Sequence, residues 1–132
     1  MSTGRYAITL DQERGLVHVV AEGEINKDLG EEVITHARKE AGEHHYNIIC
    51  DVRQATMNVD FSDWFFLPRT LGVYRNVKLR RIKTALVVSA ERQERIFRFF
   101  ETVTANLGMN IRVFFQEEEA LEWLRTEGEA RK

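Results

Sequence analysis

The sequence is poor in the features that would point to a disulfide scaffold or a membrane protein. It has one cysteine and one proline among 132 residues, and no apolar run approaches the ~20 residues that a membrane-spanning helix needs. Its N-terminus lacks the apolar stretch of a signal peptide. A single cysteine excludes an intramolecular disulfide. We therefore expect a protein that is cytoplasmic and has no integral membrane segment.

The sequence also lacks an excess of charge of one sign, since its net charge is only −2. The distribution is uneven, because residues 69–98 carry nine Lys or Arg against two Glu. Overall the chain is not basic enough to predict a nucleic-acid-binding protein. Near the basic stretch, Phe97, Phe99 and Phe100 have the spacing of a helix core rather than of stacking platforms. We predict no nucleic-acid partner.

Histidine and cysteine do not form a recognisable metal or thiol site. Cys50 lies inside an apolar run without an adjacent base, which favours a small buried hydrophobe over a reactive thiol. His44 and His45 are adjacent in a polar connection, and no Cys/His spacing supports them as ligands. His18 lies in a β-type run and is expected to be partly buried. We predict no metal and no cofactor.

The first 60 residues indicate a hairpin followed by a helix and a strand. Residues 6–10 alternate apolar and polar, a turn follows, and 16–21 form a second β-type run. Asn26 is a plausible N-cap for a helix that reaches about Ala41, and Gly42 suits the C′ position. The apolar face of this helix is formed by Leu29, Val33, Ile34, Ala37 and Ala41. Residues 46–52 then form an apolar run typical of a buried strand.

Beyond this strand the pattern alternates between helices and strands. Apolar runs at 82–88 and 110–115 predict two more strands. Ser89 and Gly108 bound a helix, and 117 to about 126 form a closing helix. The expected apolar stripe of the first of these helices is Ile96, Phe99, Phe100, Val103 and Leu107. The whole order predicts one α/β domain, residues 1–132 with a core of about 5–126, whose mixed and mostly parallel sheet is covered by helices.

A candidate binding corner follows the strand at 46–52. The strand ends near Asp51, and residues 53–60 are polar and predict a loop. Ser62 is expected to be the N-cap of the next helix, with Asp63 favoured by the helix dipole. Ligands in open α/β domains bind at such corners between a strand end and a helix. We therefore single out Asp51 and Arg53 as candidate ligand- or partner-binding residues.

Four large apolar residues follow this corner directly. Trp64, Phe65, Phe66 and Leu67 cannot all face one side of a helix. Either the segment bends enough to bury all four, or one or two side chains point away from the core. An exposed apolar patch usually marks an interaction site, and Pro68 supplies a natural hinge. We predict a binding surface here, either a lid on an apolar pocket or part of a homodimer contact.

Two motifs resemble the STAS domain, and in particular its SpoIIAA-like branch. The first is the strand Ile48-Ile-Cys-Asp-Val52, similar to the family's apolar strand that ends on Asp. The second is Val113-Phe-Phe-Gln-Glu-Glu-Glu-Ala-Leu-Glu-Trp-Leu124, which also resembles the ending of Sec14-like lipid-binding domains. The likeness extends from about Tyr6 to Leu124. It implies a SpoIIAA-like fold and a module that binds rather than catalyses.

The resemblance also raises the question of a phosphorylation switch at Ser62. In phosphorylated antagonists the corresponding loop ends in Asp-Ser-Ser-Gly, and the second Ser is the kinase target. Here Asp60 and Ser62 match, whereas Phe61 and Asp63 replace Ser and Gly. The charge of Asp63 would repel a neighbouring phosphate. We therefore interpret Ser62 as a helix cap in preference to a phosphoacceptor.

These observations leave three functional hypotheses. The first is a non-enzymatic cytoplasmic regulatory or binding module that acts through protein–protein contact. The second is a small-molecule or lipid carrier or sensor, whose apolar pocket is closed by residues 61–74. The third is an enzyme that uses Asp51 and Arg53 as a charged pair. It is disfavoured because Thr56, Asp60 and Ser62, like Asp51, have no histidine nearby in sequence to complete a catalytic set.

Overall fold

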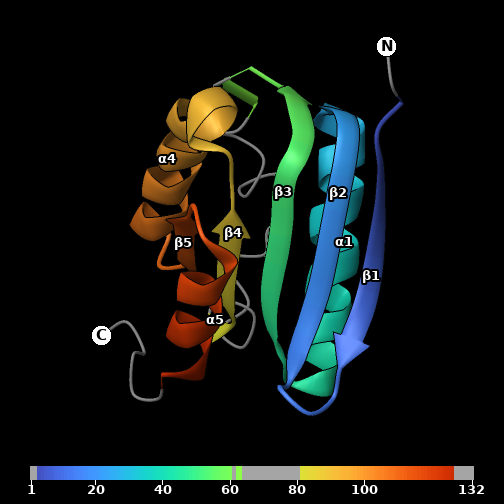
Figure 1. Ribbon diagram of the computed structural model, residues 1–132, viewed down its shortest axis with the longest axis vertical. Helices are drawn as coiled ribbons and strands as arrows, with labels where there is room; N and C mark the ends of the chain where they lie inside the picture. The colour runs from blue at the N-terminus through green and yellow to red at the C-terminus, as the bar shows by residue number, and fades with distance from the viewer. Residues whose placement is uncertain (1–2, 61, 64–80, 127–132) are drawn as a thin grey trace.

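The computed structural model describes residues 3–60, 62–63 and 81–126. Its elements follow the predicted order of an initial hairpin and then alternating helices and strands (Figure 1). They are β1 (Arg5–Asp11), β2 (Leu16–Asn26), α1 (Lys27–His44), β3 (Asn47–Asn58), β4 (Lys83–Val87), α4 (Ala90–Asn106), β5 (Asn110–Phe114) and α5 (Glu117–Arg125). The sheet order is β1-β2-β3-β4-β5. Only β1 is antiparallel to its neighbour, which confirms the predicted mixed, mostly parallel sheet.

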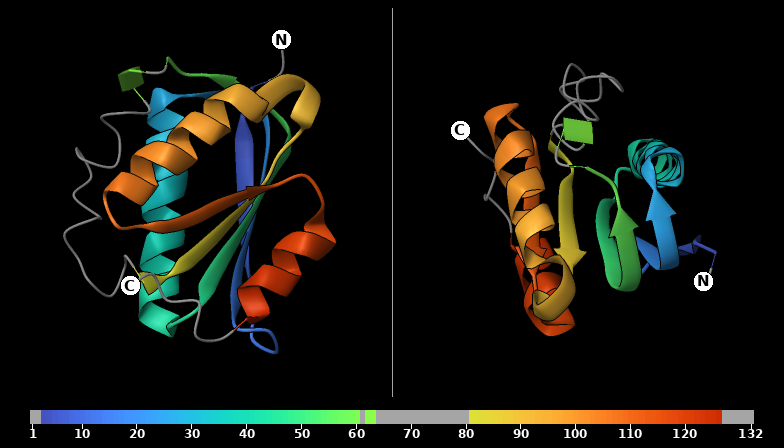
Figure 2. Two further views of the ribbon diagram at one scale, coloured as in Figure 1. Left: turned by 90° about the vertical axis from the view of Figure 1, so that its left-hand side faces the viewer. Right: turned by 90° about the horizontal axis from the view of Figure 1, so that it is seen from above.

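Helices pack on both faces of the sheet, and the two faces are covered differently. The back face packs against α1 and α4 and forms the larger core, which includes Val19, Cys50 and Leu86. The front face packs against α5 through Ile49 and Val87. Figure 2 shows α1 and α5 on opposite sides of the sheet. Within the described residues, no helix combines the length and the hydropathy required to cross a membrane.

Strand β3 is longer than its apolar run indicates. It extends to Asn58, so the prediction of a loop over 53–60 was wrong. The extension pairs with an equally extended β2, from Gln54 opposite Glu22 to Asn58 opposite Asn26. Most side chains of this extension are exposed or half-buried. Backbone pairing with β2 is a large part of what holds such a ribbon, and it leaves no apolar pattern in the sequence.

Helix α1 begins as predicted and ends later than predicted. The Asn26 side chain accepts a hydrogen bond from the Leu29 backbone N–H at 2.9 Å. The helix continues past Gly42 to His44, and His45 takes the left-handed C-cap conformation with φ 60°. The His45 N–H donates to the Ala41 carbonyl, so this non-glycine residue closes the helix where Gly42 was expected to.

Helix α4 ends at the predicted glycine, but its N-terminal hydrogen bond and its buried face differ from those predicted. Gly108 has φ 80°, a conformation that favours glycine. Ser89 makes no side-chain capping bond, and its backbone N–H donates instead to Gln93 Oε1 at 3.1 Å. The buried face of the helix is Phe97, Phe100, Val103 and Thr104. Ile96, Phe99 and Leu107 are only half-buried, so the predicted stripe was partly wrong.

Candidate functional site

The candidate site lies where β3 and β4 part. Asp51 opposite Val87 is the last pair between these strands, and β4 ends at Val87 while β3 continues to Asn58. From Val52 onward β3 therefore has a strand neighbour on one side only among the described strands. Its buried backbone groups on the other side need partners other than β4, because buried polar groups without partners are costly.

A β-bulge occurs at the same place. Val20 of β2 pairs with Asp51 of β3, whereas Glu22 pairs with Gln54, so β3 holds one extra residue. A bulge interrupts the ladder and changes the direction of a side chain. Here the Arg53 backbone N–H donates to Asp51 Oδ1 at 3.1 Å. The Asp51 carboxylate thus takes the place of a ladder acceptor.

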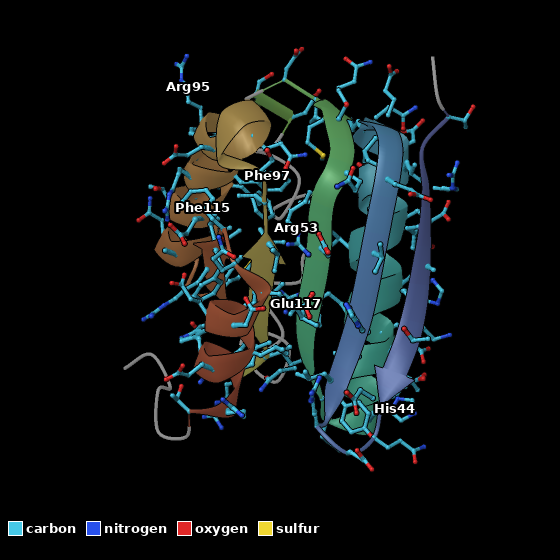
Figure 3. The ribbon with its side chains drawn as sticks, in the orientation of Figure 1. His44, Arg53, Arg95, Phe97, Phe115 and Glu117 are labelled. Atoms are coloured by element: carbon cyan, nitrogen blue, oxygen red, sulfur yellow. The ribbon has the colours of Figure 1, made fainter. Side chains whose placement is uncertain are left out.

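The same carboxylate holds the Arg53 side chain. Arg53 Nε donates to Asp51 Oδ1 at 3.0 Å and Nη2 donates to Oδ2 at 2.8 Å. This bidentate pairing fixes the plane of the guanidinium. Glu117, the first residue of α5, places Oε1 3.6 Å from Arg53 Nη2, and Figure 3 shows the two side chains on the front of the molecule. We call Asp51, Arg53 and Glu117 the front cluster.

The front cluster is accessible and remains charged. The Asp51 side chain is 18% exposed, and those of Arg53 and Glu117 are 38% and 39% exposed. Burial raises the pKa of Asp51, but the hydrogen bonds and charge of Arg53, with a smaller contribution from His18, outweigh it, so the pKa lies below its ordinary value. The hydrogen bond to Asp51 raises the pKa of Arg53. A carboxylate of this kind is a poor proton acceptor at neutral pH, so the cluster suits recognition better than acid–base chemistry.

A buried glutamine connects the extension of β3 to α4. Gln93 is 3% exposed, and its Nε2 donates to the Val52 carbonyl at 2.9 Å and to the Ala55 carbonyl. Its Oε1 accepts from Ser89 N, as described above. Gln93 thereby supplies donors where β4 no longer does. The sequence did not reveal it, because Gln93 lies four positions after Ser89, whereas the Glu or Gln of a capping box lies three positions after the cap.

The back face contains a small apolar cavity between α1 and α4. Its lining includes Val19, Val33, Ala37, Leu86, Phe100 and Ile111. The space open to the centre of a water molecule is about 60 Å³, enough for water. Arg38 lines it while only 4% exposed, and burial lowers the pKa of Arg38 to about 10. Thr84 Oγ1 is buried there and has no hydrogen-bond partner among the described residues. Neither residue was anticipated, because the apolar pattern of a sequence does not reveal a buried polar side chain.

The other predicted residues fall in different places. Cys50 is buried, and burial together with the charge of Asp51 raises the pKa of its thiol to about 12. Ser62 is exposed and has helical backbone; the backbone N–H groups that it was predicted to cap lie outside the described residues, so its role as an N-cap stays a prediction. The segment from Trp64 to Leu67 lies outside the described residues. Across residues 3–60, 62–63 and 81–126, no three His, Cys, Asp or Glu side chains converge as metal ligands.

Comparison with known proteins now identifies the class of this fold. Residues 16–125 match the SpoIIAA-like family, so the chain belongs to that family, as its motifs indicated. A similar solved structure is an uncharacterised protein from Shewanella loihica with a SpoIIAA-like fold. It has 17% identity and a TM-score of 0.57, with 94% of this chain and 98% of that chain covered.

A second similar structure is the anti-sigma factor antagonist SpoIIAA in its unphosphorylated form. It has 20% identity and a TM-score of 0.54, with 92% of this chain and 98% of that chain covered. At these identities the structural likeness establishes the fold alone. The comparison with curated proteins gives no match.

Proposed function

We propose that this protein is a non-enzymatic regulatory or binding module that acts through contact with another protein. The observation that carries the proposal is the front cluster, an ion pair that is fixed in geometry, charged at neutral pH and accessible. Family membership supports the same conclusion, and the similar SpoIIAA structure belongs to an anti-sigma factor antagonist. With two carboxylates around one guanidinium, the front cluster best complements a basic side chain of the partner.

Site-specific crosslinking in the source cells tests this proposal. A photoreactive residue at Gln54, which is exposed beside Arg53, should capture a protein partner; the same probe at exposed Lys39 on α1 is the control. The adduct from Gln54 should be lost when Arg53 is changed to Ala. The proposal fails if both positions give the same adducts, or if the Arg53 variant leaves the Gln54 adduct unchanged.

The absence of catalysis is tested separately. Screening against esterase, phosphatase and nucleotide substrates should show no turnover, because Asp51 is held as an ionised partner of Arg53. Turnover that disappears in a folded Asp51→Ala or Arg53→Ala variant would establish an enzyme at the front cluster and overturn this part of the proposal.

Ser62 is not the main switch in this proposal. Its exposed position leaves the hydroxyl accessible. The argument against phosphorylation rests on Asp63, whose adjacent negative charge would repel a phosphate on Ser62. Intact-mass measurement of protein from the source cells should show no stoichiometric phosphate. A full phosphate that maps to Ser62 would reverse this conclusion.

A small apolar ligand in the cavity between α1 and α4 is the second candidate. The specific observation in its favour is Thr84 Oγ1, a buried hydroxyl without a hydrogen-bond partner among the described residues, which lines this mostly apolar space together with Arg38. The space is small, so a ligand larger than water requires the helices to move apart. Native mass spectrometry should then find a co-purified molecule, and Ala37→Leu should remove it by filling the cavity. A ligand-free protein whose unfolding temperature no apolar compound changes would exclude this candidate.

A further inference from the structure

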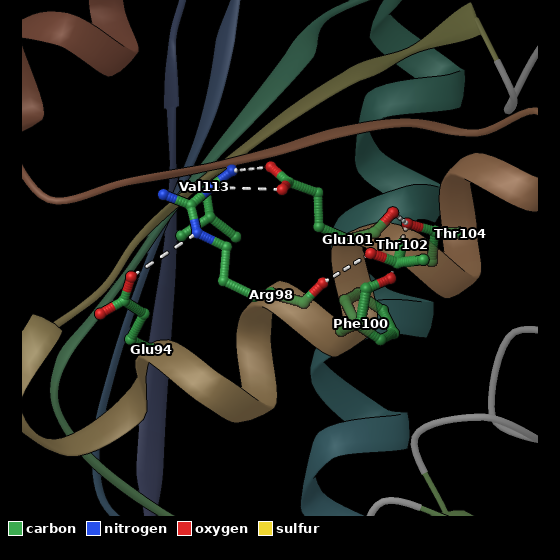
Figure 4. Close-up of polar contacts among 7 residues, drawn as sticks. All are labelled: Glu94, Arg98, Phe100, Glu101, Thr102, Thr104 and Val113. Atoms are coloured by element: carbon green, nitrogen blue, oxygen red, sulfur yellow. Dashed lines mark hydrogen bonds and ion pairs between the residues drawn. The ribbon is translucent and has the colours of Figure 1, made fainter.

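The two edge strands of the sheet differ in whether side chains protect their outer backbone groups. At the β5 edge, the Val113 N–H donates to Glu101 Oε2 of α4 at 2.7 Å. Arg98 holds the same carboxylate through Nη1 at 3.2 Å (Figure 4). A carboxylate in this position occupies the donor that a further strand would need. Proteins commonly protect an edge strand with such charged groups.

Strand β1 at the opposite edge shows no comparable protection in the described part of the chain. It pairs with β2 and is last in the sheet order. Its sequence, RYAITLD, has no proline and carries its charges only at Arg5 and Asp11, the two ends. Leu10 is 36% exposed, one of two large apolar side chains that are exposed among the described residues. An edge strand whose five central residues are uncharged is a template for another strand.

We infer that β1 pairs antiparallel with β1 of a second copy of this chain, around a two-fold axis at Ile8. In this register Arg5 lies opposite Asp11 of the second copy, and Asp11 opposite Arg5. Tyr6 lies opposite Leu10, and Ala7 opposite Thr9. Opposite charges and aromatic–aliphatic pairs stabilise directly facing strand positions. Antiparallel registers that are shifted along the strand leave part of β1 unpaired and separate the charges.

The alternation of side chains supports the same register. Tyr6 and Ile8 pack toward α1, where the Tyr6 hydroxyl donates to Glu32 at 3.0 Å. Leu10 shares their face, since strand side chains alternate. Pairing therefore covers the exposed Leu10 with Tyr6 of the second copy. Thr9 and Ala7, both exposed, meet on the front face.

The pairing predicts a symmetric and reversible dimer. A two-fold axis makes the same strand serve as both surfaces of the interface, and the two sheets become one continuous sheet. One pair of edge strands is a small interface, and small interfaces are typically weak. We therefore expect a dimer that forms at high protein concentration and dissociates on dilution.

Disulfide trapping tests the two-fold axis. Facing residues in antiparallel strands have Cα atoms about 4.5–5.5 Å apart, within the range of a disulfide. The native Cys50 is buried, so an added cysteine is the more accessible thiol. Ile8→Cys should form a covalent dimer on mild oxidation of the full chain. Val20→Cys, at a residue 41% exposed on the neighbouring strand, should stay monomeric. Equal crosslinking of the two variants overturns the register.

Charge reversal tests the interface without a cysteine. Arg5→Asp or Asp11→Arg alone places like charges opposite each other twice per dimer, so the dissociation constant should rise roughly tenfold. The double variant should restore dimerisation. Glu22→Gln, which removes only the ion pair of Arg5 within one chain, should leave the dimer intact. A wild-type protein that is monomeric at high concentration in analytical ultracentrifugation overturns the inference. A dimer that is indifferent to both reversals overturns it equally and assigns the contact to another surface.

Discussion

The two halves of β3 differ in their neighbours and in the interactions that stabilise them. From Ile48 to Asp51 the strand has β2 on one side and β4 on the other. From Val52 to Asn58 its one strand neighbour in the described part of the chain is β2, and the Gln93 side chain bonds to carbonyls that β4 does not reach. The first half is stabilised by apolar burial, whereas the second depends on particular hydrogen bonds. The front cluster lies at the boundary between the two halves.

This difference explains why the accessible charged residues are found where they are. In a central strand, the two neighbouring strands already bond to the backbone N–H and C=O groups, so no polar side chain is needed as a partner. Where the ladder stops, Asp51 and Gln93 supply an acceptor and donors. The hydrogen bond from the Arg53 backbone N–H holds the Asp51 carboxylate in place, and the carboxylate in turn orients the guanidinium of Arg53. The proposed recognition would therefore use a geometry that the fold already requires.

The largest expected effect comes from the first half of β3. Ile49 is 1% exposed on the front face of the sheet, and Ile49→Ala should lower the free energy of unfolding by about 2–5 kcal/mol. Chemical denaturation measures this loss. Thr56→Ala in the exposed second half is the control and should change stability by less than about 0.5 kcal/mol. Equal losses at the two positions would erase the distinction between the halves.

The next effect concerns the glutamine that replaces β4. Gln93→Leu leaves the Val52 and Ala55 carbonyls and the Ser89 N–H without their partner, so stability should fall by on the order of 3 kcal/mol. Hydrogen exchange locates the damage: the amides of 54–58 should exchange faster while those of 48–50 keep their protection. Uniform loss of protection along β3 would mean that the two halves unfold as one unit.

Asp51→Asn should have a smaller effect that depends on pH. Asn retains an acceptor for the Arg53 N–H but loses the charge, so the cost at pH 7 should be about 1.5 kcal/mol. The pKa of Asp51 is lowered in the folded protein, so its contribution is present above the ordinary pKa of about 3.9. That contribution is lost as the pH falls through the folded value. Denaturation at pH 7 and pH 3 should show wild type and variant converging in acid, and a constant difference would contradict the assigned ion pair.

Sequence patterns predicted the order of elements well, because apolar periodicity reports burial and most elements here are half-buried. They failed for the second half of β3, where buried Val52 and Ala55 are interspersed with exposed polar side chains and form no continuous apolar pattern. The pairing of Asp51 with Arg53 could be predicted because the two residues are close together in one strand; their role in binding stays a prediction. Glu117 and Gln93 could not be assigned to them, since they come from separate helices that only the folded chain brings to β3.

Glu117→Gln should have the smallest effect and sharpens the assignment of Arg53 to Asp51. The 3.6 Å contact joins two side chains that are each more than a third exposed, and such pairs contribute little. Loss of a first-turn carboxylate adds a small helix-dipole term, so stability should fall by no more than about 1 kcal/mol. In an Asp51→Asn background the same change should cost more, because Arg53 then depends on Glu117. A double-mutant cycle measures this coupling. If the cost of Glu117→Gln already equals that of Asp51→Asn in the wild type, Arg53 is shared between the two acids and the second half of β3 is held from α5 as well.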